Sequence, residues 1–524
     1  MNLRNELEEK TEYRKYLYSR GYLITTNEDI DLDAYPFYSD WTVRKVGKFC
    51  FYIKNGQHLY ILENGEETFF IVGHAYNPFT MEKSEDGILL EISSAVRENR
   101  LFEKINELTG NFLFGLINKG ELTFLSDPSC MLVCYYGVCG GNVYLSQYSQ
   151  LIGDICNLEQ SEYVKRLVSS RFYSLFGRML PGDMSPYDKF RHTVPNFVYT
   201  LNSDGSFTHR RFYPVEKLEQ GEEISGERYC EIVDASAKIL RGNLELISGK
   251  WKIPAISMTG GCDSKTTLSC ANGLYDRFIY YSHISSEAEA VDAKAAEKIC
   301  KNLNLEHKTD FIPEKDEDVA DIEIWREILR TNCGNIGANN RNDVRKRAYY
   351  AENHYFDVEI KSWVSEVVRA YFSKRFDCYK FPEKPYPRIM TAMYKVFFGD
   401  RKLLRETDKI FEKFLGEYGS DEVFEKINWV DLFFWEFRVS SWNGPVISNE
   451  HTLSYDIAIP YNNRILIEKM LSLPLEYRIS DKCHKDIQKK MNEKIYDMGI
   501  SVTNLKHTDK RAKAEKLYLI FRKM

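Results

Sequence analysis

A glycine-rich segment near the middle of the chain carries residue types that bind phosphate. It reads ISMTGGCDSKTTL, residues 256–268, and lies where a buried strand should be followed by a helix. Glycine lets backbone N–H groups approach an anion closely, and the positive end of the following helix adds to the attraction. We expect the phosphates of a nucleoside triphosphate to contact Thr259, Gly260, Gly261, Ser264 and Lys265.

Asp263 lies inside this segment and changes the chemistry expected there. A carboxylate repels a bare phosphate but is a ligand for the Mg²⁺ that accompanies a triphosphate. The segment is not the common P-loop, because Ser264 precedes Lys265 where that motif requires glycine. The alternative interpretation is a glycine turn that only lets a strand and a helix pack closely. The residues of this segment alone favour neither the phosphate-binding interpretation nor the packing interpretation.

The elements around the segment indicate where it must lie. Apolar residues recur at helical spacing between 228 and 247, and IPAISM, residues 253–258, is typical of a buried strand. FIYYSHI (278–284) is expected as a strand, EAVDAKAAEKICKNL (289–303) as a helix and HKTDFI (307–312) as a strand. This alternation favours a parallel sheet covered on both faces, and the roughly 150 C-terminal residues are expected to be mainly helical.

The first part of the chain has a different texture. Short apolar or alternating runs are separated by Gly, Asn, Asp and Pro, and they are FCFYIK, LYILEN, ETFFIVG, NFLFGLIN, LTFLSD, NVYLSQ and FVYTLN. This pattern is typical of antiparallel sheets. A hairpin is expected with its turn at Asp204-Gly205. We place the domain boundary after this hairpin, which gives domains at 1–215 and 216–524.

Several stretches together resemble the asparagine synthetase family of N-type ATP pyrophosphatases, which includes β-lactam synthetase and lasso-peptide cyclases. TGGCDS (259–264) resembles the family's S-G-G-x-D-S loop, and residues 289–307 resemble the helix after its second strand. Residues 454–478 look like its E-x-R-x-P-F-L-D-x-R-L-V-E…L-P stretch, and HKDIQ (484–488) looks like K-x-L-R. Residues 110–152 resemble the glutaminase domain's G-D-F-A-F…R-D-P-x-G pattern.

The resemblance implies a fold that combines α/β and α+β classes. An N-terminal antiparallel β-sandwich of the Ntn-hydrolase type, at 1–215, would precede an asparagine synthase-like ATP-binding domain at 216–524. The second domain would be a parallel-sheet, pyrophosphatase-loop domain of the adenine nucleotide α-hydrolase type with a helical C-terminal part.

The resemblance also implies AMP-forming amide ligation. A substrate carboxylate attacks the α-phosphate of ATP, pyrophosphate leaves, and an amine then displaces AMP from the acyl-adenylate. The implied cofactors are ATP and Mg²⁺, with Mg²⁺ bound by Asp263. The implied substrates are a small-molecule or peptide carboxylate and an amine donor, and the interpretation allows a homodimer.

Two candidate catalytic residues follow from the same resemblance. Lys485 matches the family lysine that stabilises the leaving pyrophosphate, although a solvent-facing lysine on a charged helix is the alternative. KSWVSEV, residues 361–367, is the best counterpart of the family's G-E-G-A-D-E segment, with Ser365 in place of its aspartate and Ser362 in place of its base. Glu366 is the only acidic residue of the family segment that is retained here. An ordinary acidic residue in the first turn of a helix is an equally good interpretation of Glu366. Further candidates for the base are Tyr349, Tyr350 and Glu359.

The N-terminal half departs from the glutamine-hydrolysing members of the family. Those enzymes use a cysteine at the mature N-terminus as the nucleophile, with its own α-amine as base. This chain begins Met1-Asn2-Leu3, and its first cysteine is Cys50, within a strand-like run. We therefore expect an inactive glutaminase-like scaffold, with nitrogen supplied by free ammonia or a substrate amine.

Composition and charge narrow the class of protein. The 524 residues carry a formal net charge of −6, which gives no general attraction to nucleic acid or to an anionic membrane. The chain has no long uncharged apolar run, so we expect a cytoplasmic protein. Its twelve cysteines lack disulfide or zinc spacing. The basic tail from 506 to 524 is expected to be a solvated helix, with closure over a polyphosphate as the alternative.

Three other segments have two interpretations each. GHAYNPF (73–79) favours a tight turn beside a strand over a binding loop. FFWEFRVSSW (433–442) is expected to be core, with a pocket wall as the alternative. The polar segment from Asn332 to Arg345 is either flexible surface or a loop that closes over substrate.

Other functions stay open at this point. A pyrophosphatase-loop enzyme of another type, such as a tRNA-thiolating enzyme, would need a basic RNA-binding surface and usually a cysteine pair, and neither is evident. A glutamine-hydrolysing asparagine synthetase proper is a second alternative. A non-catalytic ATP-binding relative is a third, and the altered segment at 361–367 supports it.

Overall fold

The computed structural model describes residues 2–218, 220–221, 223–337, 341–500 and 509–523. Within the fully described stretch 22–211, the predicted strands form two six-stranded antiparallel sheets. The first has the order β10 (Phe190–His192), β8 (Tyr135–Cys139), β9 (Asn142–Ser146), β1 (Tyr22–Thr25), β3 (Phe49–Lys54), β2 (Trp41–Val46). The second has the order β12 (Phe207–Arg211), β11 (Phe197–Leu201), β7 (Glu121–Ser126), β6 (Thr109–Asn118), β5 (Glu67–Tyr76), β4 (Leu59–Asn64).

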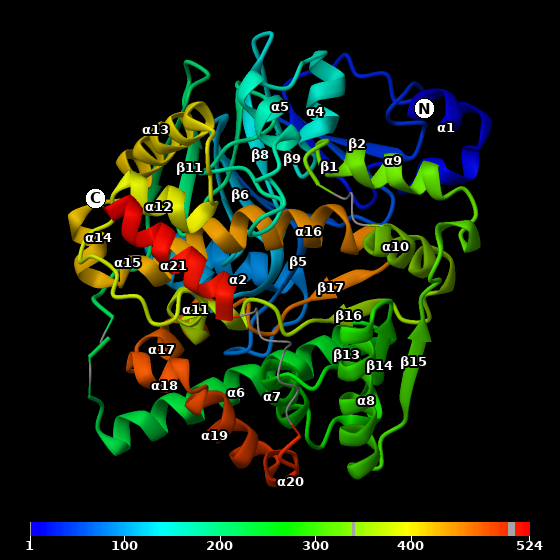
Figure 1. The fold of residues 1–524 in the computed structure, drawn as a ribbon. Coiled ribbons are helices and arrows are strands. Elements are labelled where there is room, and N and C mark those ends of the chain that lie inside the picture. The colour runs from blue at the N-terminus through cyan, green and yellow to red at the C-terminus, as the bar shows by residue number, and fades with distance from the viewer. Residues whose placement is uncertain (1, 219, 222, 338–340, 501–508, 524) are drawn as a thin grey trace.

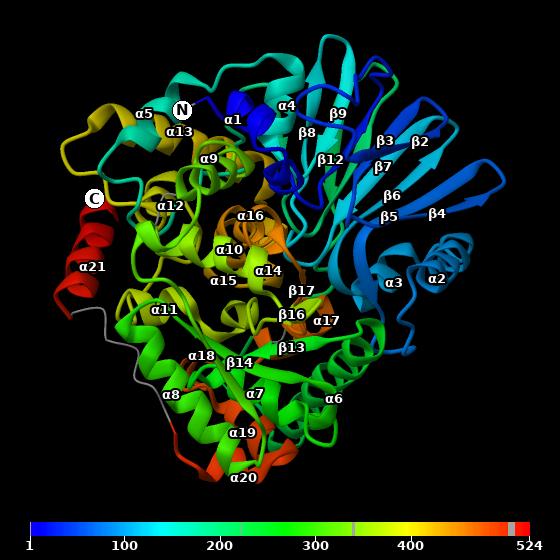
Figure 2. The same ribbon diagram turned by 90° about the vertical axis from the view of Figure 1, so that its right-hand side faces the viewer.

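The two antiparallel sheets pack face to face (Figure 2). The rings of Phe51 and Phe70 meet between them with centroids 5.0 Å apart. Because side chains alternate along a strand, Tyr22 and Ile24 join this shared core while Leu23 joins a second core on the opposite face. Helices cover both outer faces, so the layer order is helix, sheet, sheet, helix. The covering helices are α2 (Glu85–Arg97), α3 (Leu101–Glu107), α4 (Ser149–Cys156) and α9 (Ile322–Asn332).

A parallel sheet follows, as the alternating pattern predicted. Its order is β15 (His307–Phe311), β14 (Ile279–Ile284), β13 (Pro254–Ser257), β16 (Val358–Ile360), β17 (Asp456–Ala458). The helices of its alternating units are α6 (Gly226–Lys250), α7 (Cys262–Cys270), α8 (Glu287–Asn302) and α10 (Arg341–Asn353). The glycine-rich segment connects the central strand β13 to α7, which is the position the sequence predicted.

The C-terminal part is mainly helical, which confirms that prediction (Figure 1). Its elements include α11 (Tyr371–Arg375), α12 (Pro387–Tyr394), α13 (Arg401–Tyr418), α14 (Asp421–Lys426), α15 (Trp429–Phe433), α16 (Gly444–Asn449), α17 (Arg464–Leu471), α18 (Leu475–Ile479), α19 (Lys482–Met491), α20 (Glu493–Asp497) and α21 (Asp509–Lys523). The segment Phe434–Asn443 between α15 and α16 is a π-helix. A mixed α/β protein with antiparallel sheets, a parallel sheet and a helical C-terminal part is therefore what the chain forms.

The two halves share one continuous apolar core. The predicted boundary at 215 lies in the connection between β12 and α6, and the division into two domains stays a prediction. Polar contacts also join the halves: the side-chain amide of Asn111 on β6 donates to the carbonyl of Ile457 on β17 at 2.8 Å. None of the described helices is long and apolar enough to cross a bilayer.

The segment GHAYNPF is partly strand rather than turn. Gly73 to Tyr76 complete β5, and the chain turns only after Asn77, whose backbone pairs with Glu82. The prediction of a tight turn beside a strand is therefore right for its second half. The histidine of this segment, His74, takes part in the contact between the two halves of the molecule, because its Nε2 lies 3.1 Å from Oδ2 of Asp456 on β17.

Candidate active site

The glycine loop after β13 presents its backbone donors at the carboxyl edge of the parallel sheet. The amide of Gly260 donates to Asp292 Oδ1 on α8 at 3.2 Å, and that of Gly261 donates to Thr259 Oγ1 at 3.2 Å. The amide of Thr259 donates to Ser264 Oγ at 3.1 Å. An anionic ligand that takes these donors must therefore displace a carboxylate and two hydroxyl oxygens of the chain itself.

Asp263 extends from the first turn of α7 into a cluster of polar groups. Its Oδ1 accepts a hydrogen bond from Ser365 Oγ at 2.5 Å, and its Oδ2 forms an ion pair with Arg369. Arg369 also donates through two nitrogens to Asp481 at 2.8 and 2.9 Å. Both carboxylate oxygens of Asp263 are thus held by donors of the chain.

Three segments that are far apart in the sequence meet at this cluster. Ser365 and Ser362 come directly after β16, and Ser362 Oγ lies 2.7 Å from Thr267 Oγ1 on α7. His484 on α19 lies 2.9 Å from Ser365 Oγ. The stretches 361–367 and 484–488, which resemble family motifs, are therefore both in contact with α7, which the glycine loop opens.

The structure places Lys485 beside this cluster, on the exposed side of α19. Its Nζ donates to the carbonyl of Ser480 at 2.8 Å. The preceding residue, His484, is 2% exposed and faces Asp263 instead. Burial lowers the pKa of His484 to about 4, and the nearby charge of Arg369 adds to the effect while Asp263 opposes it. The imidazole is therefore neutral at pH 7.

Lys265 and Glu366 lie next to the cluster without joining its hydrogen bonds. Lys265 Nζ donates to the carbonyl of Ile500 at 2.6 Å, and burial lowers its pKa. Glu366 is an exposed residue. Desolvation of its carboxyl group by the surrounding protein, together with the negative charge of Asp263, nevertheless raises its pKa. It begins the short helix Ser365–Arg369, so the prediction of a first-turn acid is met and a catalytic role stays a prediction.

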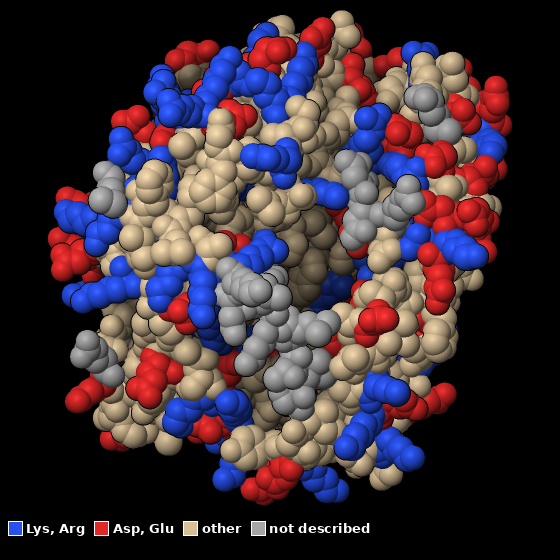
Figure 3. Space-filling view, viewed as in Figure 1, with Lys and Arg blue, Asp and Glu red and all other residues tan. Residues whose placement is uncertain are grey.

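A cavity of about 970 Å³ opens directly beside the loop. Thr259, Asp292 and Ser257 line one end, and Arg178, Cys333 and Glu450 line the other. The face drawn in Figure 3 is hollowed near its centre, over the region where α10, α16 and the parallel sheet lie in Figure 1. The walls come from both halves of the chain, because Tyr135 and His192 belong to the first antiparallel sheet.

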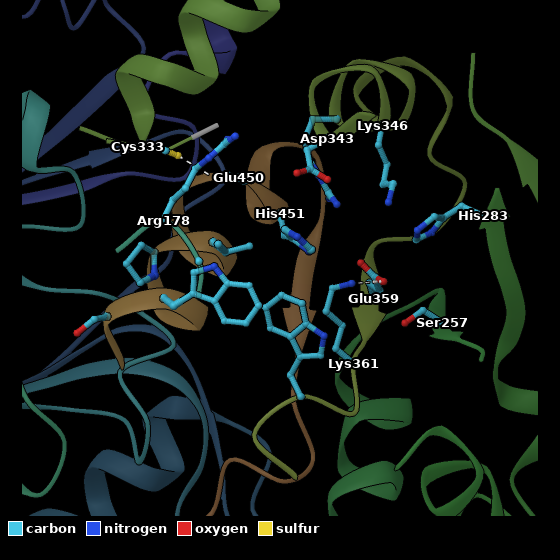
Figure 4. A pocket seen from close by; sticks show the side chains of 18 of the residues that line it. Arg178, Ser257, His283, Cys333, Asp343, Lys346, Glu359, Lys361, Glu450 and His451 are labelled. Atoms are coloured by element: carbon cyan, nitrogen blue, oxygen red, sulfur yellow. Dashed lines mark hydrogen bonds and ion pairs between the residues drawn. The ribbon is translucent and has the colours of Figure 1, made fainter. Parts of the chain in front are cut away.

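Two ion pairs contribute to the cavity wall, and one of them, between Lys361 and Glu359, is drawn in Figure 4. Lys361 Nζ lies 2.6 Å from Glu359 Oε1, and Lys346 Nζ lies 2.7 Å from Glu289 Oε1. Burial acts to raise the pKa of Glu359, but the charge of Lys361 outweighs it and holds that pKa below its usual value. His283 approaches Glu289 at 3.3 Å. Glu359, one of the predicted bases, is therefore a charged and paired group.

Glu450 at the far end of the cavity has a different character. Its Oε1 accepts from the thiol of Cys333 at 3.3 Å, and within the described ranges no lysine or arginine forms an ion pair with it. Burial raises its pKa from 4.5 to about 7, and repulsion by Asp343 adds to the effect. A carboxyl group that titrates near neutrality is suited to general acid–base chemistry. Next to it, His451 Nδ1 is buried without a hydrogen-bond partner.

Aromatic side chains close the cavity near Lys361. The indoles of Trp363 and Trp442 are nearly parallel, at 14°, with centroids 6.2 Å apart. Trp442 lies at the end of the π-helix Phe434–Asn443, a kind of helix that is frequent at functional sites. The alternative interpretation of 433–442 as a pocket wall is right for Ser441 and Trp442, while the residues before them are core.

The polar segment between α9 and α10 borders the same cavity. Cys333, Gly337 and Asp343 line it, whereas residues 338–340 lie outside the described part.

Tyr350, another predicted base, is 2% exposed and donates to Asp310 rather than to the cavity. In the basic tail, residues 501–508 are also outside the described part, and Arg522 of α21 pairs with Asp408 at 2.5 Å.

Three residues of this site were missed by sequence reasoning: Arg369, His484 and Glu450. Arg369 and His484 lie within four residues of predicted positions, in VVRAYF and HKDIQ. Their charges could be read from the sequence, but their directions depend on how the helices are rotated. Nothing in the local sequence around Glu450 indicates a cavity.

The Mg²⁺ implied by the resemblance fits this arrangement poorly. Its predicted ligand, Asp263, has both oxygens engaged, one of them by a guanidinium that stays charged at any relevant pH. The second position, an aspartate in the family pattern, is Ser365. Among the described groups around Asp263, Arg369 supplies the positive charge. The mechanism proposed below therefore has no metal ion at Asp263.

Comparisons with known proteins leave the family open. No family model and no curated protein matches the chain. Similar solved structures include glutamine PRPP amidotransferase from B. subtilis complexed with ADP and GMP, at 10% identity, TM-score 0.23, and coverage of 52% of this chain and 61% of that one. An allosteric regulatory enzyme of purine biosynthesis matches at 9% identity, TM-score 0.24, and coverage of 52% and 62%.

Glutamine-dependent NAD⁺ synthetase from Acinetobacter baumannii, in complex with ADP, matches at 10% identity and TM-score 0.20, over 44% of this chain and 49% of that one. The chain thus spans less than two thirds of each of these structures. At these TM-scores the likeness carries no argument about function, and the case for one rests on the geometry of the chain itself.

Proposed function

We propose that this protein is an ATP-dependent, amide-forming ligase of the asparagine synthase kind. It would activate a substrate carboxylate as an acyl-adenylate and transfer the acyl group to ammonia or to a substrate amine. The observation that carries the proposal is the meeting of the glycine loop, the segment 361–367 and α19 around Asp263, with Thr259 of the loop lining a large cavity. Ligands of open parallel sheets bind at this edge.

The expected chemistry balances as follows. A carboxylate oxygen of the substrate bonds to the α-phosphorus of ATP, and the bond from that phosphorus to the leaving pyrophosphate breaks. The amine nitrogen then bonds to the acyl carbon, AMP leaves with the former carboxylate oxygen, and a base takes the amine proton. Developing negative charge on pyrophosphate is stabilised by preorganised donors and cations.

The residues of the chain supply most of these roles. Arg369 and Lys265 are cations beside the loop, the Gly260 amide becomes a free donor once Asp292 withdraws, and the Gly261 amide does so once Thr259 Oγ1 withdraws. Glu450 is our candidate for the base, because it lines the cavity and titrates near pH 7. The two tryptophans would exclude water from the acyl-adenylate, which water otherwise hydrolyses.

The test is carboxylate-dependent exchange of labelled pyrophosphate into ATP. We expect exchange with the full chain and a suitable carboxylate. Asp263→Ala should lower it about 10²- to 10³-fold, because the substitution releases Arg369 and Ser365 from the positions in which Asp263 holds them. Asp276→Ala is the matched control, because Asp276 is an exposed aspartate of the same half that lies away from the loop. Normal exchange in the Asp263 variant would remove this aspartate from the mechanism.

A second candidate function is binding of ATP without catalysis. It is favoured by the ion pair of Asp263 with Arg369 and by Ser365 in place of an aspartate. ATP binding to the full chain without exchange, over a broad panel of carboxylates and amines, would select it. Added glutamine is expected to yield no glutamate in either case.

A further inference from the structure

We propose that a divalent transition-metal ion of the Zn²⁺ class binds between His58, His74 and Asp456, where the antiparallel and parallel sheets meet. Each of these residues offers one ligand atom, and the three atoms lie within 4.8 Å of one another. This site is remote from the glycine loop: Asp456 begins β17 at the amino edge of the parallel sheet, whereas the loop follows the carboxyl end of β13. The inference does not depend on the proposed ligase function.

His74 is held in the orientation of a metal-binding histidine. Its Nε2 lies 3.1 Å from Asp456 Oδ2, and its Nδ1 lies 3.5 Å from Glu85 Oε1. Glu85 in turn pairs with Lys250 at 2.7 Å. A carboxylate behind one imidazole nitrogen, with the other nitrogen directed at a ligand, is the usual arrangement around protein-bound zinc. Nδ1 is buried and faces the Glu85 carboxylate at 3.5 Å, without the geometry of a full hydrogen bond.

His58 completes the set from the opposite side. It precedes β4, its ring centroid is 4.7 Å from that of His74, and it is exposed. An exposed side chain can rotate by the small amount needed to bring its nitrogen to the ion.

Asp456 keeps one oxygen for the ion. Arg20 pairs with Oδ1 at 2.5 Å, while Oδ2 faces His74 and the indole N–H of Trp251, which donates at 2.8 Å. Arg20 and Lys250 balance Asp456 and Glu85, so the site gives a cation little net attraction. Two imidazoles and a single carboxylate therefore favour Zn²⁺, Co²⁺ or Ni²⁺, which bond to nitrogen, over Mg²⁺ or Ca²⁺.

The ion has a route in and a structural consequence. A groove of about 750 Å³ lies over the three residues, and His354 lines it as well. The bound metal would join β4, β5 and β17, and thus fasten the two halves of the chain together.

The experiment uses the full chain stripped with a chelator. Co²⁺ titration followed by visible absorption, and Zn²⁺ titration followed by calorimetry, should show one ion per chain and a raised thermal midpoint. His58→Ala should weaken binding at least about tenfold, and because His58 is exposed this variant is expected to fold. His354→Ala is the control, since His354 lines the groove without belonging to the ligand set.

His74→Gln is a second variant, expected to abolish binding. The proposal is overturned if the stripped chain takes up no Zn²⁺ or Co²⁺ at about 100 times a micromolar Kd, or if His58→Ala and His354→Ala bind equally well. Pyrophosphate exchange measured on the same samples separates the two proposals, because loss of one property leaves the other intact.

Discussion

Two edges of the same parallel sheet hold an aspartate beside an arginine, and they differ in what else surrounds the pair. At the carboxyl edge, Asp263 meets Arg369 and a serine hydroxyl. At the amino edge, Asp456 meets Arg20 and His74, with His58 close by. A guanidinium cannot give up its proton, whereas an imidazole can, and only the imidazole then becomes a metal ligand.

The comparison teaches that the neighbours of a carboxylate decide its chemistry. From its sequence context alone, Asp263 is predicted to be a magnesium ligand, whereas the sequence around Asp456 predicts no ligand. In the folded chain the first is neutralised by a fixed cation beside the amides of the glycine loop, and the second has the nitrogen donors that a transition metal prefers. The predictions below test this contrast from the largest expected effect to the smallest.

Arg369→Met should produce the largest change, because it removes the fixed cation from the carboxyl edge. Without added metal, in EDTA, we expect the variant to bind ATP about 10- to 100-fold more weakly than the unaltered chain, the worth of one or two charge-assisted hydrogen bonds. Added Mg²⁺ should restore much of the binding, since Asp263 is then free to ligate it. Fluorescence titration with a labelled ATP analogue measures both.

Arg277→Met is the control, because Arg277 is an exposed arginine in the short helix Tyr275–Arg277 that precedes β14. The contrast between the edges breaks down if the unaltered chain binds ATP only when Mg²⁺ is present, because Asp263 would then be acting as a metal ligand in spite of Arg369.

Asp456→Asn should produce an intermediate change in stability at the amino edge. The substitution leaves Arg20 and His74 without their carboxylate, and we expect about 2 kcal/mol of destabilisation in metal-free buffer, less than for a fully buried pair because Arg20 is partly exposed. The denaturant midpoint of the metal-free chain measures it. An unchanged midpoint would show that this network contributes nothing to the contact between the halves.

Glu450→Gln should have the smallest effect, and one that depends on pH. Because burial raises the pKa of Glu450 from 4.5 to about 7, the folded chain holds its proton more tightly than the unfolded chain. That contribution is present below pH 4.5 and is lost as the pH rises through 7. Glutamine does not titrate, so we expect the variant to gain about 1 kcal/mol relative to the unaltered chain between pH 5 and pH 6.

Denaturant unfolding at the two pH values checks this expectation. A constant difference between the two chains would mean that Glu450 is ionised and paired throughout, like Glu359 in the same cavity. In that case its assignment as the base of the proposed reaction would also fall.

The sequence predicted the elements well because their signals are local. Residues 49–54 and 59–64 form strands with the predicted bounds, and the hairpin turns at Asp204-Gly205, where Gly205 has a φ of +83°. The strand before the glycine loop, and the helix that precedes this strand, also lie within a few residues of their predicted bounds. Apolar periodicity and turn residues carry this information over a handful of neighbouring positions.

The direction of individual side chains was not predictable in the same way. HKDIQ was correctly placed beside the loop, but His484 rather than Lys485 faces Asp263. Successive residues of a helix point about 100° apart, so the rotation of α19 against α7 decides which one reaches the site. KSWVSEV was likewise placed correctly after β16, while the role of Arg369 four residues further on depends on the helix Ser365–Arg369.

By itself, the sequence determined where strands, helices and the glycine loop lie along the chain, because those choices are made among near neighbours. Only the tertiary structure decided which charges meet. Asp263 with Arg369, and His74 with Asp456, are pairs from distant parts of the chain, and a carboxylate's affinity for a proton, a guanidinium or a metal is set by groups within a few ångströms of it.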